Sequence, residues 1–138
     1  MKKLLVLSLM AMVLCGCGSN AEPQSATKES AKDADGNYAT ATVEVTDGKI
    51  TAISLDEIMG EASKKELGED YGMKVASKIG KHWHEQVEFL ENYIVENGLE
   101  AVELDDAGYA KNDDVLAGCT INVMNMINTA KEAEGSLK

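Results

Sequence analysis

Arginine is absent from this 138-residue chain, and proline occurs only once. Without the planar guanidinium fork, any site for phosphate or carboxylate must rely on lysines and backbone N–H groups. Asp and Glu together number 24 against 13 Lys, which gives a formal net charge of −11. This balance argues against nucleic acid as a partner, because phosphate backbones are bound by basic surfaces.

Long apolar runs are also scarce, and the clearest one lies at the start of the chain. It extends from Leu4 to Leu14, is interrupted only by Ser8, and follows two lysines. About eleven residues at about 1.5 Å each are too short to cross a hydrocarbon core of about 30 Å. The pattern is that of an export signal peptide rather than a membrane-spanning helix.

The signal ends in Leu14-Cys15-Gly16-Cys17, which resembles the lipobox that bacterial lipoprotein signal peptidase cuts before a cysteine. Cys17 is the better candidate because the small Gly16 precedes it, whereas Cys15 follows the bulky Leu14. The resemblance implies that residues 1–16 are removed and that Cys17 carries a diacylglyceryl group, whose two acyl chains suffice for stable anchoring. We therefore expect a lipid-anchored protein on the outer face of the bacterial cytoplasmic membrane.

Cleavage would remove two lysines and no acidic residue, which moves the formal charge from −11 to −13. It would also leave Cys119 as the only unmodified cysteine, so that no internal disulfide is possible. After Cys17, residues 18–36 are polar, contain Pro23 and have no large apolar side chain. Such a segment is unable to bury a core, and we expect residues 17–36 to be the lipidated cysteine and a flexible tether.

Residues 37–134 are enough for one small domain, followed by a tail over 135–138. Apolar and polar residues alternate from 38 to 45, and Asp47-Gly48 connects this run to a second one over 50–55. Asp-Gly between such runs predicts a β-hairpin. Residues 56–74 show no clear pattern and are expected to be a loop or a short irregular helix.

Two amphipathic helices are predicted after the hairpin. The first spans about 77–97, with Ser77 as a plausible N-cap and Gly98 after its end, and its apolar face is formed by Ile79, Trp83, Val87, Leu90 and Ile94. The second begins near Thr120 and buries Val123, Met124, Ile127 and Ala130. Between them, 99–104 is either a strand or a helical turn. The predicted fold class is α+β, a small antiparallel sheet packed against two or more helices.

Residues 114–120 read Asp-Val-Leu-Ala-Gly-Cys-Thr and resemble a motif of the FMN-binding domain in the C and G subunits of sodium-pumping quinone reductase and Rnf complexes. In that family a flavin transferase joins the FMN phosphate to the threonine hydroxyl. The resemblance implies covalent FMN at Thr120, with Gly118, Cys119 and Asp114 as the other motif residues. A helix beginning near Thr120 would offer free N–H groups to the phosphate.

Two positions depart from that motif, because Ala117 replaces a serine and Cys119 replaces an alanine. The alternative explanation is structural, with Thr120 as a helix N-cap and Gly118 as a turn residue. Residues 64–74, 79–83 and 85–86 are in addition similar to a family of Firmicute surface lipoproteins related to these domains. In that family the C-terminal motif is often degenerate.

Other candidate sites are weaker. His82 and His84 are two residues apart on the predicted helix, about 200° around its axis, and are not expected to bind one metal ion together. Trp83 is expected in the core rather than at a flavin. No catalytic triad, P-loop or cysteine cluster is present, so turnover by this chain alone is not expected. Two hypotheses remain: an electron carrier that works with a flavin transferase and a membrane quinone reductase, or a cofactor-free surface module for ligand capture or protein interaction.

Overall fold

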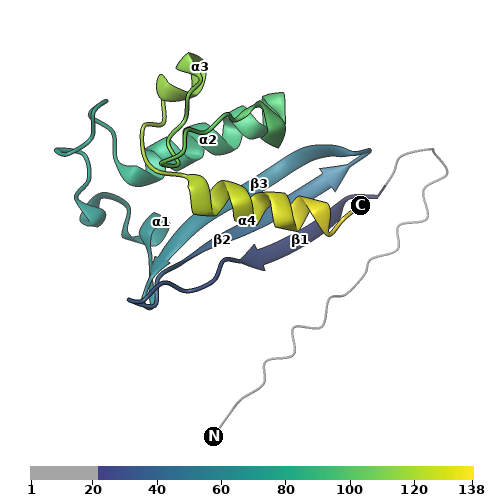
Figure 1. The fold of residues 1–138 in the computed structure, drawn as a ribbon, viewed down its shortest axis with the longest axis horizontal. Helices are drawn as coiled ribbons and strands as arrows, with labels where there is room; N and C mark the ends of the chain where they lie inside the picture. Colours follow the sequence, from purple (N-terminus) through teal and green to yellow (C-terminus); the bar gives the residue numbers. More distant parts are fainter. Residues whose placement is uncertain (1–21) are drawn as a thin grey trace, which may run out of the picture.

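The computed structural model describes residues 22–138, and the predicted signal peptide and Cys17 lie outside the described residues. The fold is α+β, as predicted. Its antiparallel sheet has four strands in the order β1-β2-β3-β4. The strands are β1 Gln24–Glu29, β2 Tyr38–Thr46, β3 Lys49–Met59 and β4 Ala62–Ser63. The helices are α1 Lys64–Leu67, α2 Trp83–Asn97, α3 Asp113–Leu116 and α4 Met124–Gly135, with 3₁₀ turns at Gly68–Tyr71 and Leu99–Ala101 (Figure 1).

The predicted hairpin is present and is longer than expected. Asp47 and Gly48 both have positive φ, 53° and 75°, which is the type I′ geometry that suits the twist of two paired strands. Alternation along β2 buries Ala39, Ala41 and Val43 on one face. The hairpin therefore supplies one apolar and one polar face to the rest of the molecule.

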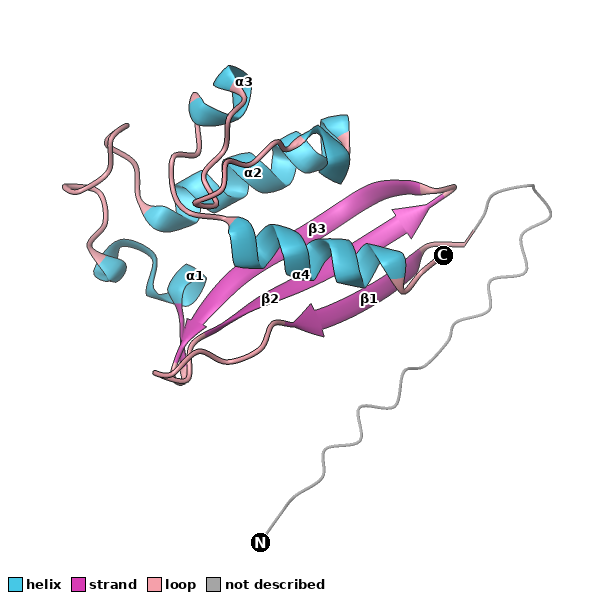
Figure 2. Ribbon diagram, in the orientation of Figure 1, coloured by secondary structure: helices cyan, strands magenta, loops and turns pink. Residues whose placement is uncertain are grey.

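Two helices cover the apolar face of the sheet (Figure 2). Helix α4 packs on β2 and β1, and α2 packs on β3. The small side chains of Ala39 and Ala41 on the sheet and of Ala130 and Ala133 on α4 are all buried, which lets this helix lie close to the strands. The stripe of Trp83, Val87, Leu90 and Ile94 on α2 is buried as predicted. One core thus lies between a single sheet and two helices.

The predicted tether is wrong over residues 24–29. These residues form β1, which pairs antiparallel with β2 from Gln24 opposite Val45 to Glu29 opposite Thr40. Residues after β1 are also ordered by local hydrogen bonds, since Asp33 Oδ1 accepts the backbone N–H groups of Asp35 and Asn37 at 2.9 Å each. A polar strand can be stable at a sheet edge because its backbone bonds are satisfied on one side and solvated on the other.

Both helix starts were predicted too early. Helix α2 begins at Trp83, not near Ser77, and the His82 N–H donates to Glu85 Oε2 at 2.8 Å in the position of a capping residue. Its predicted end at Asn97 is confirmed, with Gly98 at φ 89°. Helix α4 begins at Met124 rather than near Thr120. Residues 119–123 form no regular element and bend at Ile121, with Cys119, Ile121 and Val123 buried in alternation.

The regions that the sequence left open are now assigned. For residues 56–74 the expected loop or short irregular helix is wrong where β3 continues to Met59 and β4 follows, whereas α1 and a 3₁₀ turn occupy residues 64–71. Leu99–Ala101 is a helical turn rather than a strand. No helix among residues 22–138 is long and apolar enough to span a membrane.

Candidate functional site

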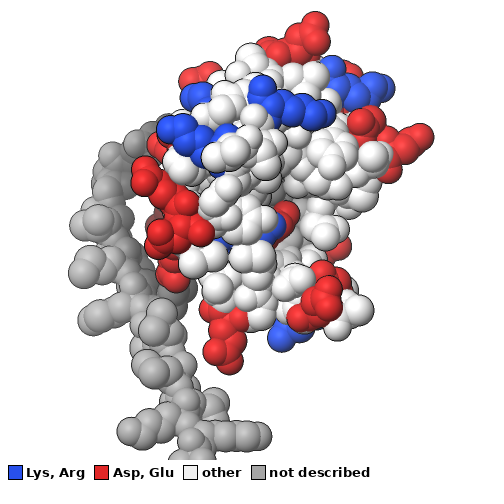
Figure 3. Space-filling view, turned by 90° about the vertical axis from the view of Figure 1, so that its left-hand side faces the viewer, with Lys and Arg blue, Asp and Glu red and all other residues white. Residues whose placement is uncertain are grey.

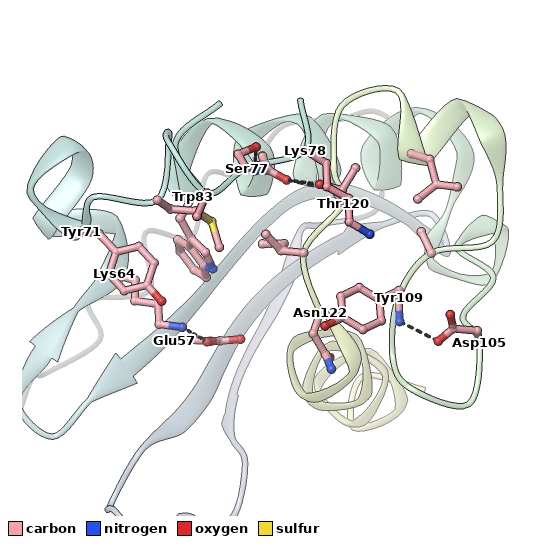
Figure 4. A pocket seen from close by; sticks show the side chains of 16 residues that line it. Glu57, Lys64, Tyr71, Ser77, Lys78, Trp83, Asp105, Tyr109, Thr120 and Asn122 are labelled. Carbon is pink, nitrogen blue, oxygen red and sulfur yellow. Dashed lines mark hydrogen bonds and ion pairs between the residues drawn. The ribbon is translucent and has the colours of Figure 1, made fainter. Parts of the chain in front are cut away.

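A cavity of about 620 Å³ lies at the end of the sheet opposite the β2–β3 hairpin turn. Its walls come from β3, α1 and the 3₁₀ turn that ends at Tyr71, from the loop 72–82 and the first turn of α2, and from the segments 105–110 and 116–122. Figure 4 shows side chains from these elements arranged around the opening. This volume is in the usual range for small-molecule sites.

Gln86 organises the polar side of the cavity. It is fully buried, and its Oε1 accepts both the Thr120 N–H at 2.9 Å and the Thr120 hydroxyl at 3.3 Å. Its Nε2 donates to Ser77 Oγ at 3.1 Å and to the Lys81 carbonyl at 3.2 Å. One amide on α2 therefore joins the loop before the helix to the segment that carries Thr120, and all its hydrogen-bonding groups are used.

The opposite wall carries a shielded ion pair. The Lys64 ammonium contacts the Glu57 carboxylate and lies 5.0 Å from the ring centroid of Tyr71 and 5.3 Å from that of Trp83. Burial lowers the pKa of Lys64, but the hydrogen bond and charge of Glu57, with a smaller contribution from Tyr71, raise it above its usual value overall. Lys64 is therefore a permanent cation held by a carboxylate and two aromatic faces.

The third wall is built from two loops that fix each other. Asp105 Oδ1 accepts the N–H groups of Ala107 at 2.9 Å and Tyr109 at 3.0 Å, and Asn122 Nδ2 donates to the Ala107 carbonyl at 2.7 Å. Gly108 has φ 95°, and an added Cβ there would lie 2.5 Å from Asn122 Oδ1. The close approach of these loops thus requires glycine and places the Tyr109 ring beside Asn122 (Figure 4).

Of the four predicted motif residues, only Thr120 lines the cavity. The Gly118 backbone packs against the Phe89 ring, and a Cβ added at Gly118 would lie 2.3 Å from Phe89 Cγ. Asp114 Oδ2 accepts a hydrogen bond from the Tyr93 hydroxyl at 3.0 Å. The structure therefore does not gather the motif into one site.

Cys119 is buried, with 1% of its surface exposed, and burial raises the pKa of its thiol to about 11. It thus behaves as a small core residue rather than as a reactive thiol.

Thr120 is also not at a helix terminus. The prediction that free N–H groups of a helix beginning there bind the FMN phosphate is therefore wrong, and so is the alternative that Thr120 is a helix N-cap. It lies four residues before Met124, and the Met124 N–H donates to Asn122 Oδ1 at 3.1 Å. The alternation of Cys119, Ile121 and Val123 is the signal that could have argued against a helix here.

The two histidines are nearer to each other than the helical prediction allowed. Because His82 precedes the first turn of α2, its ring stacks on that of His84, with centroids 5.5 Å apart and planes 20° apart. The nearest carboxylate oxygen to His82 Nε2 is that of the exposed Glu69, at 3.9 Å. Among residues 22–138 no group of three or more metal-ligating side chains is present.

These observations define a small α+β domain with a cavity at one end of its sheet. No protein-family model and no curated protein matches the chain. Two solved structures share the fold, both from structural-genomics work on clostridia. A solution NMR structure of a Clostridium thermocellum protein matches with 26% identity and TM-score 0.57, covering 85% of this chain and 92% of that one. A crystal structure of a Clostridium perfringens protein matches with 26% identity and TM-score 0.55, covering 84% and 91%.

Proposed function

We propose that this protein is a lipid-anchored extracytoplasmic carrier that holds FMN by a phosphoester on Thr120, with the cavity as the flavin site. The observation that carries the proposal is the position of the Thr120 side chain, which lies on the wall of a cavity of about 620 Å³. The sequence motif and the cavity are independent observations, because the cavity involves residues far from the motif. FMN would supply one- and two-electron transfer, and the chain would position it.

The cavity residues are chemically suited to a flavin. Tyr71 and Tyr109 provide aromatic surface, with Met73 and Ile121 as apolar neighbours, and the buried Trp83 lies behind them. Lys78 lines the cavity, is exposed, and has no ion-pair partner among residues 22–138, so its ammonium is available to a phosphate. In a chain without arginine, lysine is the expected phosphate ligand.

Gln86 prepares Thr120 for modification. Esterification replaces the hydroxyl proton with phosphorus, so the 3.3 Å hydrogen bond from Thr120 Oγ1 to Gln86 Oε1 would be lost. The 2.9 Å bond from the Thr120 N–H to the same oxygen does not involve the hydroxyl and would remain. The segment can therefore keep its place while its side chain is modified.

The anchor is proposed from the sequence, with residues 1–16 as a signal peptide and Cys17 as the acylated residue. The proposed partners are a flavin transferase that modifies Thr120 and a membrane quinone reductase that exchanges electrons with the flavin. The chain itself is proposed to carry electrons rather than to turn over a substrate.

The test is the intact mass of the mature protein, produced with its signal peptide together with a competent flavin transferase. The expected mass includes the lipid and FMN less one water. Thr120→Val, which keeps the shape but removes the hydroxyl, should lack the FMN, whereas Thr120→Ser should retain it. A wild-type mass that accounts only for the lipidated chain would contradict the proposal.

A cofactor-free surface module is the second candidate, and a specific observation favours it. Gly118, Asp114 and Cys119 are each explained by packing or by a hydrogen bond within the domain, without any ligand. This candidate predicts a colourless protein in which Thr120→Val leaves every binding property unchanged. Titration of the protein with free FMN, followed through the fluorescence of the single tryptophan, would separate it from a flavin protein that merely lacks its transferase.

A further inference from the structure

The chain between Cys17 and the folded domain is short. Pairing of β1 with β2 fixes the backbone from Gln24 onward, so only the seven residue steps from Cys17 to Gln24 can act as a connection. At about 3.6 Å per residue or less, these steps span at most about 25 Å whatever their conformation.

The connection enters the domain at its hairpin end. Gln24 lies opposite Val45, which pairs with Ile50 on the far side of the β2–β3 turn. The C-terminus lies at the same end of the molecule (Figure 1). An anchor on Cys17 would therefore hold this end nearest to the bilayer.

The cavity lies at the other end of the sheet. Glu57, one of its lining residues, pairs with Ala39, six residues along β2 from Val45, which is about 20 Å at 3.3 Å per residue. Strand β3 ends at Met59, nine residues from Ile50 and thus about 30 Å away. Figure 3 looks onto this end and shows a hollow with charged atoms at its bottom.

We infer that the protein stands on the membrane on its hairpin end, so that the cavity opens away from the bilayer and receives a water-soluble partner. The inference depends on one part of the proposed function, the lipid on Cys17. A connection of at most about 25 Å is shorter than the sheet, which is about 30 Å long, so the domain is unable to turn end over end and bring the far end of β3 onto the bilayer. A reactant confined to the hydrocarbon core does not reach the cavity, and a membrane quinone reductase reaches it only through a domain that projects into water.

The alternative geometry is a domain that lies on its side. The loop 72–82 at the rim of the cavity carries Lys74, Lys78 and Lys81 and no acidic residue, and Val75 on it is 99% exposed. Such a loop would be attracted to anionic lipid. The experiment must therefore compare membranes of different charge.

Two exposed lysines form a matched pair of reporter positions, Lys49 at the hairpin turn and Lys74 at the cavity rim. In a Cys119→Ala background, Lys49→Cys and Lys74→Cys are labelled with a fluorophore in the full lipoprotein, reconstituted in vesicles that contain an acceptor on lipid head groups. Because the two positions differ in height by roughly 30 Å, energy transfer should be about two-fold or more higher from Lys49→Cys. The same ratio is expected with and without phosphatidylglycerol. Equal transfer, or higher transfer from Lys74→Cys in anionic vesicles, would overturn the inference.

A longer connection provides the control. Inserting roughly 15 Gly and Ser residues between Pro23 and Gln24 lengthens the reach well beyond the domain, and the difference between the two positions should shrink. If the difference persists unchanged, the short connection does not set the orientation. Failure of the anchor is recognised separately, because a protein without acyl chains has a lower intact mass and does not sediment with the vesicles.

Discussion

The two ends of this domain are held together by different interactions. Around the hairpin and along the sheet, apolar residues from β2, β3, α2 and α4 form a continuous buried core. At the cavity end, side-chain hydrogen bonds and the ion pair between Lys64 and Glu57 add to the apolar contacts, through Gln86, Asp105, Asn122 and Lys64. The core therefore positions the site, and a small number of polar contacts shapes it.

The largest effect is expected in the core. Leu90 on α2 is fully buried between the helix and the sheet. Leu90→Ala should lower the free energy of unfolding by about 2–5 kcal/mol, from lost burial and the cavity left behind, as measured by urea denaturation. Val95→Ala on the exposed side of the same helix is the matched control and should change it by about 0.5 kcal/mol or less. Similar losses at both positions would mean that α2 does not pack as described.

A smaller but still large effect is expected at the polar end. Gln86→Leu keeps the approximate volume but removes the acceptor for the Thr120 N–H and the donor to the Lys81 carbonyl. The unfolding free energy should fall by about 2–3 kcal/mol, because buried polar groups are left unpaired. Hydrogen exchange should show that the Thr120 amide loses protection while amides in the middle of β3 keep theirs. Uniform loss across the molecule would remove the distinction between the two ends.

A substitution at Gly118 tests whether the motif glycine is needed for packing against Phe89. Gly118→Ala places a Cβ against the Phe89 ring and should cost about 1–3 kcal/mol of unfolding free energy. In a Phe89→Ala background the same substitution should cost much less, so the two changes should be strongly coupled in a double-mutant cycle. Additive effects would show that the glycine is required for another reason, such as the approach of a ligand.

Cys119 gives the smallest effect, a dependence on pH. Burial raises the pKa of its thiol from 9.0 to about 11, so the folded state holds the proton more tightly than the unfolded state. Its contribution to stability is complete below about pH 9 and is lost as the pH rises toward 11. Between pH 8 and pH 10, wild type should lose about 1 kcal/mol more unfolding free energy than Cys119→Ala. Parallel curves for the two proteins would contradict a buried thiol.

The core could be predicted because its apolar residues recur at regular spacings along the chain. The period of two in β2 and the spacing of Trp83, Val87, Leu90 and Ile94 each require one buried face. The Asp47-Gly48 sequence predicted the turn that joins β2 to β3. β1 was missed because an edge strand needs backbone partners more than apolar side chains. The start of α4 was misplaced because the helical pattern was extended backward to Thr120, although the burial of Cys119, Ile121 and Val123 alternates.

The cavity could not be predicted, because its contacts join residues far apart in the chain. Thr120 was identified by a motif, yet what holds it, Gln86, has no distinguishing pattern in the sequence around it. The stacking of His82 on His84 likewise depends on one residue lying just outside the helix. Such arrangements follow from the tertiary structure and leave no periodic trace.

The bond between Gln86 and Thr120 spans 34 positions. It can form only when α2 and the segment before α4 have docked, so the hydroxyl takes its place together with the tertiary structure. Any enzyme that modifies this threonine would consequently discriminate finished molecules from nascent ones. Consider a homologous chain that keeps the threonine at position 120 but replaces the glutamine at position 86. Such a chain would retain the sequence motif without the hydrogen bonds that hold the threonine at the cavity wall.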